Sequence, residues 1–270
     1  MKRLALLLTM TLTAASNYSS EISEWRQKRE AGLKAEGGWL TLTGLFWLHE
    51  GDNPFGKDPA NEIALDDGPA HAGAFTLHNG KVSVTLAGSS REVKPDSADA
   101  VKAGRLSLFV IKRSDKFGIR VKDPESKARR EFHGVDYFPA NEAWRVTARW
   151  VAEPRQIPIL NMLGQTENSE CPGYAVFQLQ SKEFRLYPIL EEPGAKELFY
   201  IFRDETAGKE TYGAGRFLYS DMPRNGKVVL DFNKAYNPPC TFTPYATCPL
   251  PPPENRLAVR IEAGEKKYGH

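Results

Sequence analysis

Hydrophobic and polar residues alternate strictly in many short segments of the chain. Clear examples are Lys81–Leu86, Arg105–Ile111 and Trp144–Trp150. Such alternation is typical of a strand with one buried face, because successive side chains of a strand point to opposite faces of the sheet. Turn-forming residues separate these segments at short intervals, as in sandwich and barrel folds. The pattern therefore predicts a mainly β protein with sandwich- or barrel-like antiparallel sheets.

Two pairs of neighbouring segments are predicted to form hairpins. Asp115-Lys116 would join the strand that starts at Arg105 to 118–122, and Ser181-Lys182 would join 174–180 to 184–187. Short polar turns between alternating segments favour antiparallel pairing of adjacent strands. Further strands are expected at 39–43, 198–203, 216–219, 227–231 and 258–261.

The N-terminal part of the chain has helical rather than alternating periodicity. A helix is predicted from Ser20 to about Glu36, before the pair Gly37-Gly38. Ser20 is suited to cap the first turn with its side-chain oxygen, and a glycine commonly follows the last helical residue. The apolar stripe of this helix consists of Ile22, Trp25 and Leu33.

The first residues have the features of a secretory signal peptide. Lys2 and Arg3 precede an apolar run that extends to Ala15, and small residues surround a cleavage point after Ala15 or Ser16. This arrangement predicts a signal peptide at 1–15 and a periplasmic or secreted protein. The run is too short to give a stable membrane span. A buried N-terminal helix is the alternative.

The remaining chain, residues 20–268, is predicted to form a single β-rich domain unit. Two lobes could meet near 151–163, where Glu153-Pro154 interrupts the alternation. A chain of 270 residues is long enough for one large β domain or two smaller ones.

Composition and charge narrow the function classes. Hydrophobic residues make up 41% of the chain, and the formal net charge is only +2. Without a basic stripe, nucleic-acid binding has little electrostatic support. The histidines are scattered, so no metal site is predicted. No nucleotide-binding or hydrolase motif is present, and the cofactor is left unknown.

The stretch from Asp231 to Asn255 combines many prolines with aromatic residues. Proline is excluded from helix interiors and central strands, whereas disordered segments are poor in aromatic residues. We therefore expect a long, ordered, proline-rich C-terminal loop, which is a common location for a binding or catalytic site.

The candidate ligand-binding residues are polar side chains in this loop or at nearby strand ends. They are Asp204, Tyr212, Arg216, Asp231, Asn233, Tyr236, Asn237, Asn255, Glu265 and Lys266. Carboxylates, amides and an arginine could bind a small polar molecule. The alternative is structural: asparagine and aspartate stabilise turns by bonding local backbone groups, and Arg216 could pair with Asp204 or Asp231.

The chain has three cysteines, and an exported protein favours their pairing. Cys240 and Cys248 are predicted to form a disulfide across a short loop. Free thiols and a zinc pair are the alternatives. Cys171 is interpreted as a buried or loop thiol rather than a nucleophile.

Several motifs of this chain resemble a known bacterial family, the domain of unknown function 1684. They include Gly38-Trp-Leu-Thr-Leu-Thr-Gly-Leu-Phe-Trp-Leu48, Thr211-Tyr-Gly-Ala-Gly-Arg-Phe-Leu218, Asp231-Phe-Asn-Lys-Ala-Tyr-Asn-Pro-Pro-Cys240 and Cys248-Pro-Leu-Pro-Pro-Pro-Glu-Asn255. The resemblance covers roughly residues 25 to 268. It implies one domain unit and supplies no activity. At the position of Cys171, similar proteins carry a small polar residue instead of a cysteine.

Three functions remain open from the sequence. The first is an exported protein of unknown function with a small-ligand binding site around the C-terminal loop. The second is a hydrolase-like enzyme that uses the carboxylates of Asp204, Asp231 or Glu265. The third is a structural envelope protein in which the loop serves as a brace. The oligomeric state is left unknown.

Overall fold

The computed structural model describes the backbone of residues 2–269 and the side chains of residues 17–269. The predicted signal peptide at 1–15 therefore lies outside the residues whose side chains are described. Two compact units are distinguished. Unit 1 contains Met1–Gly32, His133–Phe242 and Thr247–His270, and unit 2 contains Leu33–Phe132 and Thr243–Ala246. The segment 151–163, where a seam was predicted, lies inside unit 1. That 20–268 forms one domain unit stays a prediction.

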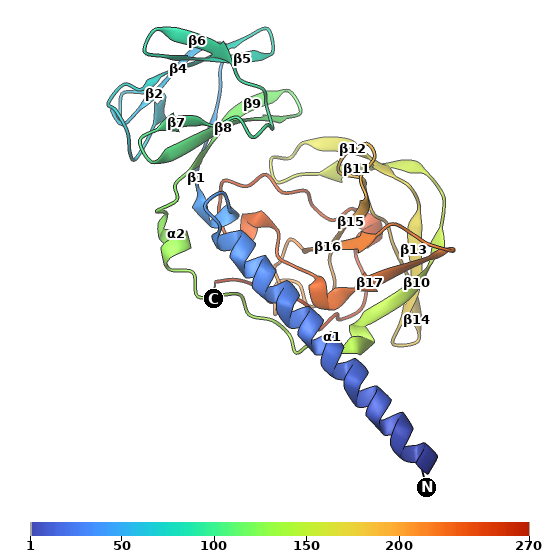
Figure 1. Ribbon diagram of the computed structural model, residues 1–270. Coiled ribbons are helices and arrows are strands. Elements are labelled where there is room, and N and C mark those ends of the chain that lie inside the picture. The colour runs from blue at the N-terminus through green and yellow to red at the C-terminus, as the bar shows by residue number, and fades with distance from the viewer. Residues whose placement is uncertain (1, 270) are drawn as a thin grey trace. The chain divides into compact units, whose positions relative to one another are not determined.

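Unit 2 consists of two sheets that share one hydrophobic core (Figure 1). The four-stranded sheet has the order β1 (Leu42–Trp47), β9 (Lys116–Lys122), β8 (Leu106–Arg113), β7 (Val101–Ala103). The five-stranded sheet has the order β3 (Ile63–Ala64), β2 (Gly51–Gly56), β4 (Gly73–His78), β5 (Lys81–Leu86), β6 (Ser89–Glu92). Phe55 and Phe75 from one sheet and Leu108 and Ile119 from the other are fully buried in this core. The short helix α2 (Lys127–Arg130) follows.

Unit 1 surrounds a second core with a four-stranded sheet, two strand pairs and the described part of α1 (Lys2–Lys34). The sheet has the order β14 (Lys182–Leu186), β13 (Tyr174–Leu179), β10 (Arg145–Val151), β17 (Lys227–Asp231). The pairs are β11 (Arg155–Leu160) with β12 (Thr166–Cys171), and β15 (Glu197–Phe202) with β16 (Arg216–Asp221). Phe177, Tyr200, Phe202 and Phe232 fill the core between the sheet and β15–β16.

The predicted fold class is confirmed: the protein is mainly β, with antiparallel sheets and one long N-terminal helix. The sheets are open rather than closed into a barrel, and among the named strands of the described chain β2 and β3 alone pair in parallel. Both predicted hairpins form, as β8–β9 and β13–β14. Among the described residues, no helix combines the length and the hydropathy needed to cross a membrane.

Two local predictions are wrong. The helix already runs through Ser20, so this residue does not cap its N-terminus, although the end at Lys34 is close to the prediction. Residues 39–41 form a turn of 3-10 helix, so the first strand starts only at Leu42.

A third prediction, the strand at 258–261 in the C-terminal segment, is also wrong. The alternation there is real, because Leu257, Val259, Ile261 and Ala263 are buried in the core of unit 1. However, these residues do not form a ladder with a neighbouring strand. The preceding loop is irregular and ordered as predicted, with 3-10 turns at Phe232–Lys234, Pro239–Thr241 and Pro253–Asn255.

Gly215 allows the chain to enter β16 and provides a stability test. Its φ is +106°, and an added Cβ would lie 2.5 Å from the carbonyl oxygen of Phe202. Gly213, two residues earlier, has an ordinary φ, and a Cβ there would meet nothing closer than 3.7 Å. We expect Gly215→Ala to lower the free energy of unfolding by more than about 1 kcal/mol, and Gly213→Ala to change it by less than that. Urea denaturation measures both, and equal effects would contradict this role of Gly215.

Candidate functional site

The side chains of Asp204 and Arg216 form an ion pair in the interior of unit 1. Arg216 Nη2 lies 3.2 Å from Asp204 Oδ1, and both side chains are almost completely buried. Burial lowers the pKa of the Arg216 guanidinium, and the Asp204 carboxylate opposes this shift. This is the structural pairing that the sequence offered as the alternative to an anion clamp.

The same pair also binds the backbone of the C-terminal segment. Arg216 donates to the carbonyl oxygens of Ile261, at 2.9 Å, and Ala263. Asp204 Oδ2 accepts from the backbone N–H of Ile261 at 2.8 Å and from Thr206 Oγ1 at 2.8 Å. The two side chains thus satisfy backbone groups that a neighbouring strand would otherwise have to satisfy, which buried backbone requires.

Glu265 connects the end of the C-terminal segment to α1 and to the proline-rich loop. Its carboxylate accepts from Arg29 Nε at 2.8 Å and from the backbone N–H of Asn237 at 2.7 Å. Burial raises the pKa of Glu265, while the Arg29 charge and the Asn237 N–H oppose that shift. Asn237 Nδ2 in turn donates to the Lys266 carbonyl at 2.7 Å. The Lys266 ammonium lies over the Phe138 ring.

Asparagine side chains support the backbone at two further places. Asn255 bridges Tyr187 and Ile201 through three hydrogen bonds of 2.8–2.9 Å to their backbone groups. Asn233 Nδ2 donates to the Asn141 carbonyl and to the Tyr18 hydroxyl. Each of these contacts fastens the irregular loop to a regular element or a distant segment of unit 1.

The three carboxylates proposed for hydrolysis have different partners. Asp204 pairs with Arg216, Glu265 pairs with Arg29, and Asp231 accepts from Tyr18. Within the described part of the chain, no hydrogen bond joins any two of them. An acid–base pair needs two titratable groups within reach of one substrate atom. Their placement gives the hydrolase hypothesis no support. In the same part of the chain, no three His, Cys, Asp or Glu side chains are grouped as metal ligands.

The cysteines are free thiols in this structure. The backbone N–H of Cys240 donates to Cys248 Sγ at 3.2 Å, so the predicted pair is brought together without being bonded. Hydrogen bonds from the Cys248 thiol and the Tyr212 hydroxyl lower the pKa of Cys240 to about 7. Cys171 is a buried thiol, as interpreted from the sequence, and donates to the Gly173 carbonyl.

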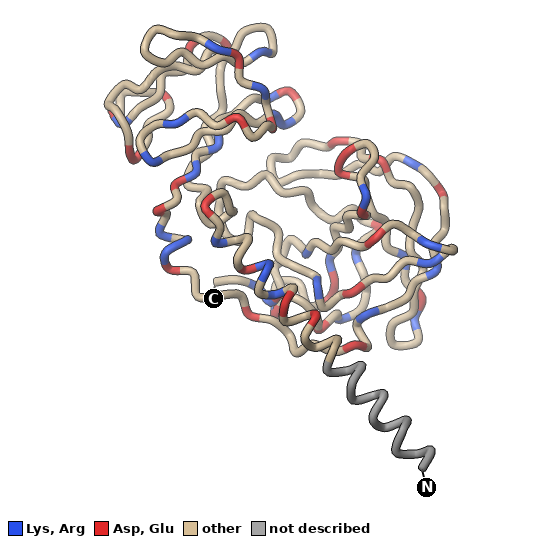
Figure 2. Tube along the Cα trace, in the orientation of Figure 1, with Lys and Arg blue, Asp and Glu red and all other residues tan. Residues whose placement is uncertain are grey.

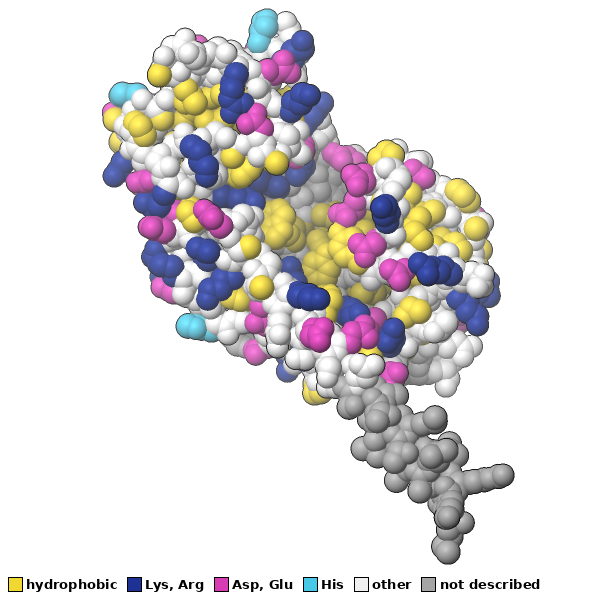
Figure 3. Space-filling model, viewed as in Figure 1, with side chains coloured by type: hydrophobic (Ala, Val, Ile, Leu, Met, Phe, Trp, Pro, Cys, Tyr) yellow, Lys and Arg dark blue, Asp and Glu magenta, His cyan; other side chains and the backbone are white. Residues whose placement is uncertain are grey.

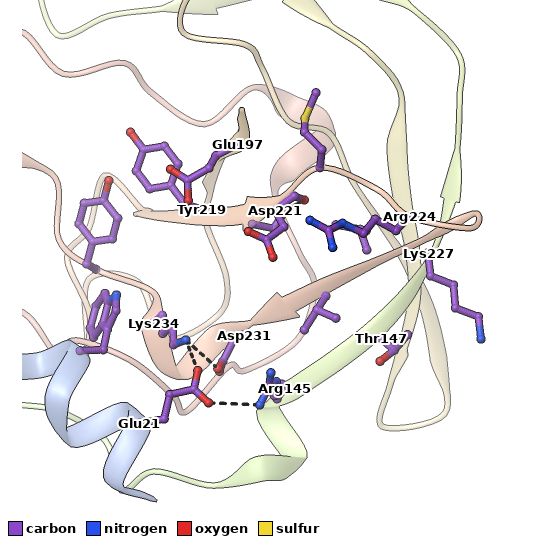
Figure 4. Close-up of a pocket in the computed structure, with 16 residues that line it drawn as sticks. Glu21, Arg145, Thr147, Glu197, Tyr219, Asp221, Arg224, Lys227, Asp231 and Lys234 are labelled. Atoms are coloured by element: carbon purple, nitrogen blue, oxygen red, sulfur yellow. Dashed lines mark hydrogen bonds and ion pairs between the residues drawn. The ribbon is translucent and has the colours of Figure 1, made fainter. Parts of the chain in front are cut away.

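A pocket of about 610 Å³ lies beside this scaffold, between β16 and β17. The two strands follow one another in the chain and meet at the Asn225-Gly226 turn, where Arg224 and Lys227 form a β-bridge. From there they diverge, because β17 pairs with β10 whereas β16 pairs with β15. Figure 4 shows this wedge, with α1 at its wide end. We call it the wedge pocket.

Aromatic and aliphatic side chains form much of the wedge pocket. Tyr219 stacks on Tyr236, with ring centroids 6.1 Å apart, and also on Phe199. The apolar residues Tyr219, Met222 and Val229 line the pocket and are 37%, 37% and 43% exposed. Figure 3 shows a hollow with hydrophobic side chains on this face of unit 1. Large apolar side chains left open in a hollow are typical of a binding surface.

Charged residues of both signs surround these apolar groups. Acidic and basic positions are interspersed along this part of the trace (Figure 2). The acidic residues that line the pocket are Glu21, Glu197, Asp221 and Asp231, and the basic residues are Arg145, Arg224, Lys227 and Lys234. Glu21 pairs with Arg145 and Lys234. Among the described residues, neither Arg224 nor Lys227 makes an ion pair.

Asp231 links the scaffold to the wedge pocket. Its side chain is 9% exposed, and its Oδ1 accepts from Tyr18 at 2.8 Å and from Asn233. Its Oδ2 is buried and accepts no hydrogen bond from the described residues; Lys234 Nζ lies 3.9 Å away. A buried carboxylate oxygen without a donor is costly. A ligand that donates an N–H or O–H here would satisfy it.

Of the ten candidate residues, the wedge pocket contains only Asp231 and Tyr236. Asp204 borders a different surface hollow, and the other buried candidates serve the scaffold. Tyr219, Met222 and Val229 were not predicted from the sequence. The Asn225-Gly226 turn between two alternating segments is a signal for a hairpin, yet nothing in it indicates that the two strands separate.

The fold and site define a mainly β protein. Its C-terminal motifs form buried hydrogen bonds and ion pairs beside an amphipathic pocket. A family model described as a protein of unknown function (DUF1684) matches residues 130–266, and the chain belongs to this family. A solution NMR structure of an uncharacterised protein from Haloarcula marismortui is 30% identical, covering 51% of this chain and 78% of that chain, with a TM-score of 0.43. No curated protein matches.

The buried ion pair yields the second stability test. Arg216→Leu leaves the Asp204 carboxylate buried without its cation, so we expect the free energy of unfolding to fall by about 3–5 kcal/mol. The matched control is Arg260→Leu, since Arg260 pairs with Glu210 but is 37% exposed. This change should cost less than about 1 kcal/mol. Chemical denaturation compares the two, and a small loss in Arg216→Leu would refute the structural role.

Proposed function

We propose that this chain is an exported protein that binds a small ligand in the wedge pocket. The observation that carries the proposal is the buried Asp231 Oδ2, which has no hydrogen-bond donor and belongs to a side chain that lines a pocket of about 610 Å³. Pockets of this size are common for small molecules. The exposed apolar residues around it support the same function.

The lining favours an amphipathic ligand with charged or polar ends. The rings of Tyr219 and Tyr236 and the side chain of Val229 offer apolar contact, whereas Asp231 calls for a donor. Arg224 and Lys227, which make no ion pair with described residues, suit a carboxylate or another anionic group. A purely apolar ligand would leave these charges without partners.

A structural role is the second candidate, because a specific observation favours it. Most of the candidate residues are buried and bonded to protein groups: Asp204, Arg216, Asn233, Asn237, Asn255 and Glu265. In this role the C-terminal motifs act as a brace, and the wedge pocket has no ligand of its own.

A thermal-shift experiment separates the two candidates. We expect one compound from a panel of amino acids, short peptides, sugars, nucleotides, fatty acids and anions to raise the melting temperature of the wild type. At a concentration of one hundred times Kd, binding adds about 2.7 kcal/mol to stability. Val229→Trp should abolish the shift by filling the pocket, whereas Leu160→Trp, at a residue 44% exposed on β11, should preserve it.

Two outcomes would count against ligand binding in the wedge pocket. A thermal shift that persists in Val229→Trp would show that the ligand binds at another site. No shift with any compound of the panel would favour the structural role.

Export and a disulfide belong to the same proposal. Cleavage after Ala15 or Ser16 would keep Tyr18, whose hydroxyl donates to Asp231, in the mature chain. In an oxidising compartment, the Cys240 thiolate would attack an external disulfide, and the Cys248 thiol would then displace the bound thiol. A pKa of about 7 supplies the Cys240 thiolate at neutral pH.

Intact-mass spectrometry tests both features after expression in a bacterium with a periplasm. We expect a periplasmic protein whose mass begins at Ser16 or Asn17 and is lower by two hydrogens than that of the fully reduced chain. Cys240→Ser should remove the two-hydrogen difference and leave the cleavage unchanged. A full-length protein in the cytoplasm would contradict export, and an unchanged mass on reduction would contradict the disulfide.

A further inference from the structure

The register of β17 leaves one side of its backbone without a partner. The Trp150 N–H donates to the Gly226 carbonyl, which makes these two residues a hydrogen-bonded pair. Because such pairs alternate along an antiparallel ladder, Val228 and Leu230 also face β10. The N–H and C=O of Val229 therefore point away from β10, toward the wedge pocket. No other described residue pairs with them.

The facing strand β16 has a matching open edge. The backbone of Phe217 exchanges two hydrogen bonds of 2.9 Å with Tyr236 on the wedge side. By the same alternation, the N–H and C=O of Tyr219 point to the wedge side, whereas Leu218 and Ser220 face β15. Beyond Tyr236, nothing in the described chain continues this pairing. The wedge pocket is thus bordered by free backbone donors and acceptors on both strands.

Open strand edges of this kind are normally covered or protected, because they can pair with another chain. Here the exposed side chains at the two central edge positions are the apolar residues Val229 and Tyr219. An extended peptide offers complementary N–H and C=O groups along its length and side chains on alternating faces. It is the ligand that uses both the free backbone groups and the apolar surface.

We propose that the wedge pocket binds a short extended peptide as an added strand between β16 and β17. This inference rests on the proposed function and specifies its ligand. The main chain of the peptide pairs with Val229 and Tyr219. An amino terminus or side-chain donor meets Asp231 Oδ2 at the wide end, and a carboxylate meets Arg224 or Lys227 at the turn. The balance of acidic and basic lining residues suits such a zwitterionic ligand.

The test starts from a pool of random five-residue peptides with free termini, incubated with the wild-type protein. Bound peptides are collected by ultrafiltration and identified by mass spectrometry. We expect enriched peptides whose binding is lost in Val229→Trp. The best peptide is then synthesised as two analogues, one for each register. One carries N-methyl groups on its odd-numbered residues and the other on its even-numbered residues. One register should bind about tenfold more weakly, because it has lost the N–H groups that pair with the open edges.

Two variants probe the protein side of the same hydrogen bonds. Val229→Pro removes the N–H that faces the wedge pocket while preserving the ladder to β10, and proline is tolerated on such an edge. Val229→Ala keeps this N–H and, like the proline variant, lacks the valine side chain, so it serves as the matched control. Titration of the peptide should show about tenfold weaker binding in Val229→Pro than in Val229→Ala. If the proline variant does not fold, the N-methylated peptides decide alone.

The possible failures are distinguishable. If no peptide is enriched while a non-peptide compound gives a thermal shift that Val229→Trp abolishes, the proposed function stands and the peptide is wrong. If both N-methylated registers bind as tightly as the parent peptide, the peptide does not bind as a strand. If neither peptides nor other compounds bind, both proposals are overturned.

Discussion

The Asp204–Arg216 ion pair is the interaction on which the rest of unit 1 depends. The C-terminal segment that contains Ile261 and Ala263 contributes alternating buried side chains to the core. Its first residues, Leu257 and Val259, pair with the backbone of Arg203 and Glu205, but no described strand pairs with 260–263. There the carboxylate and the guanidinium take the place of a strand by binding the N–H and C=O groups of the segment. A buried pair is stable only when its remaining donors and acceptors are satisfied, and the backbone of this segment satisfies most of them. Charge burial and backbone pairing therefore support each other.

Other buried polar contacts hold the proline-rich loop and α1 in the same way. Glu265 joins Arg29 of α1 to the backbone of Asn237, and Asn255 joins two strand ends. These residues explain how a loop rich in proline, which has few backbone donors of its own, remains ordered. They also explain why long and specific sequence motifs need not mark a catalytic site. Their specificity reflects the exact pairing that buried polar groups require.

Much of the fold could be predicted from the sequence because strand periodicity and turns are local features. The hairpins β8–β9 and β13–β14 were predicted on this basis. The strand expected at 258–261 failed because periodicity reports burial and does not report a hydrogen-bonding partner. For Asp204 and Arg216 the sequence left two alternatives, ligand binding and a structural ion pair. The choice between them depends on a contact between distant segments, which the sequence does not show. Val229 and Tyr219 were missed for a similar reason: the wedge pocket exists because β17 pairs with β10 instead of β16.

Amide hydrogen exchange of the ligand-free protein, resolved by residue, can show whether the C-terminal motifs are internal structural contacts while the open strand edges form the binding site. The amides of Ile261 and Asn237, which donate to Asp204 and Glu265, should exchange among the slowest in unit 1. The amides of Val229 and Tyr219 should exchange fast although their strands are stable. Fast exchange at Ile261 and Asn237, together with protection at Val229 and Tyr219, would show that the C-terminal contacts are weak and that the strand edges are already paired.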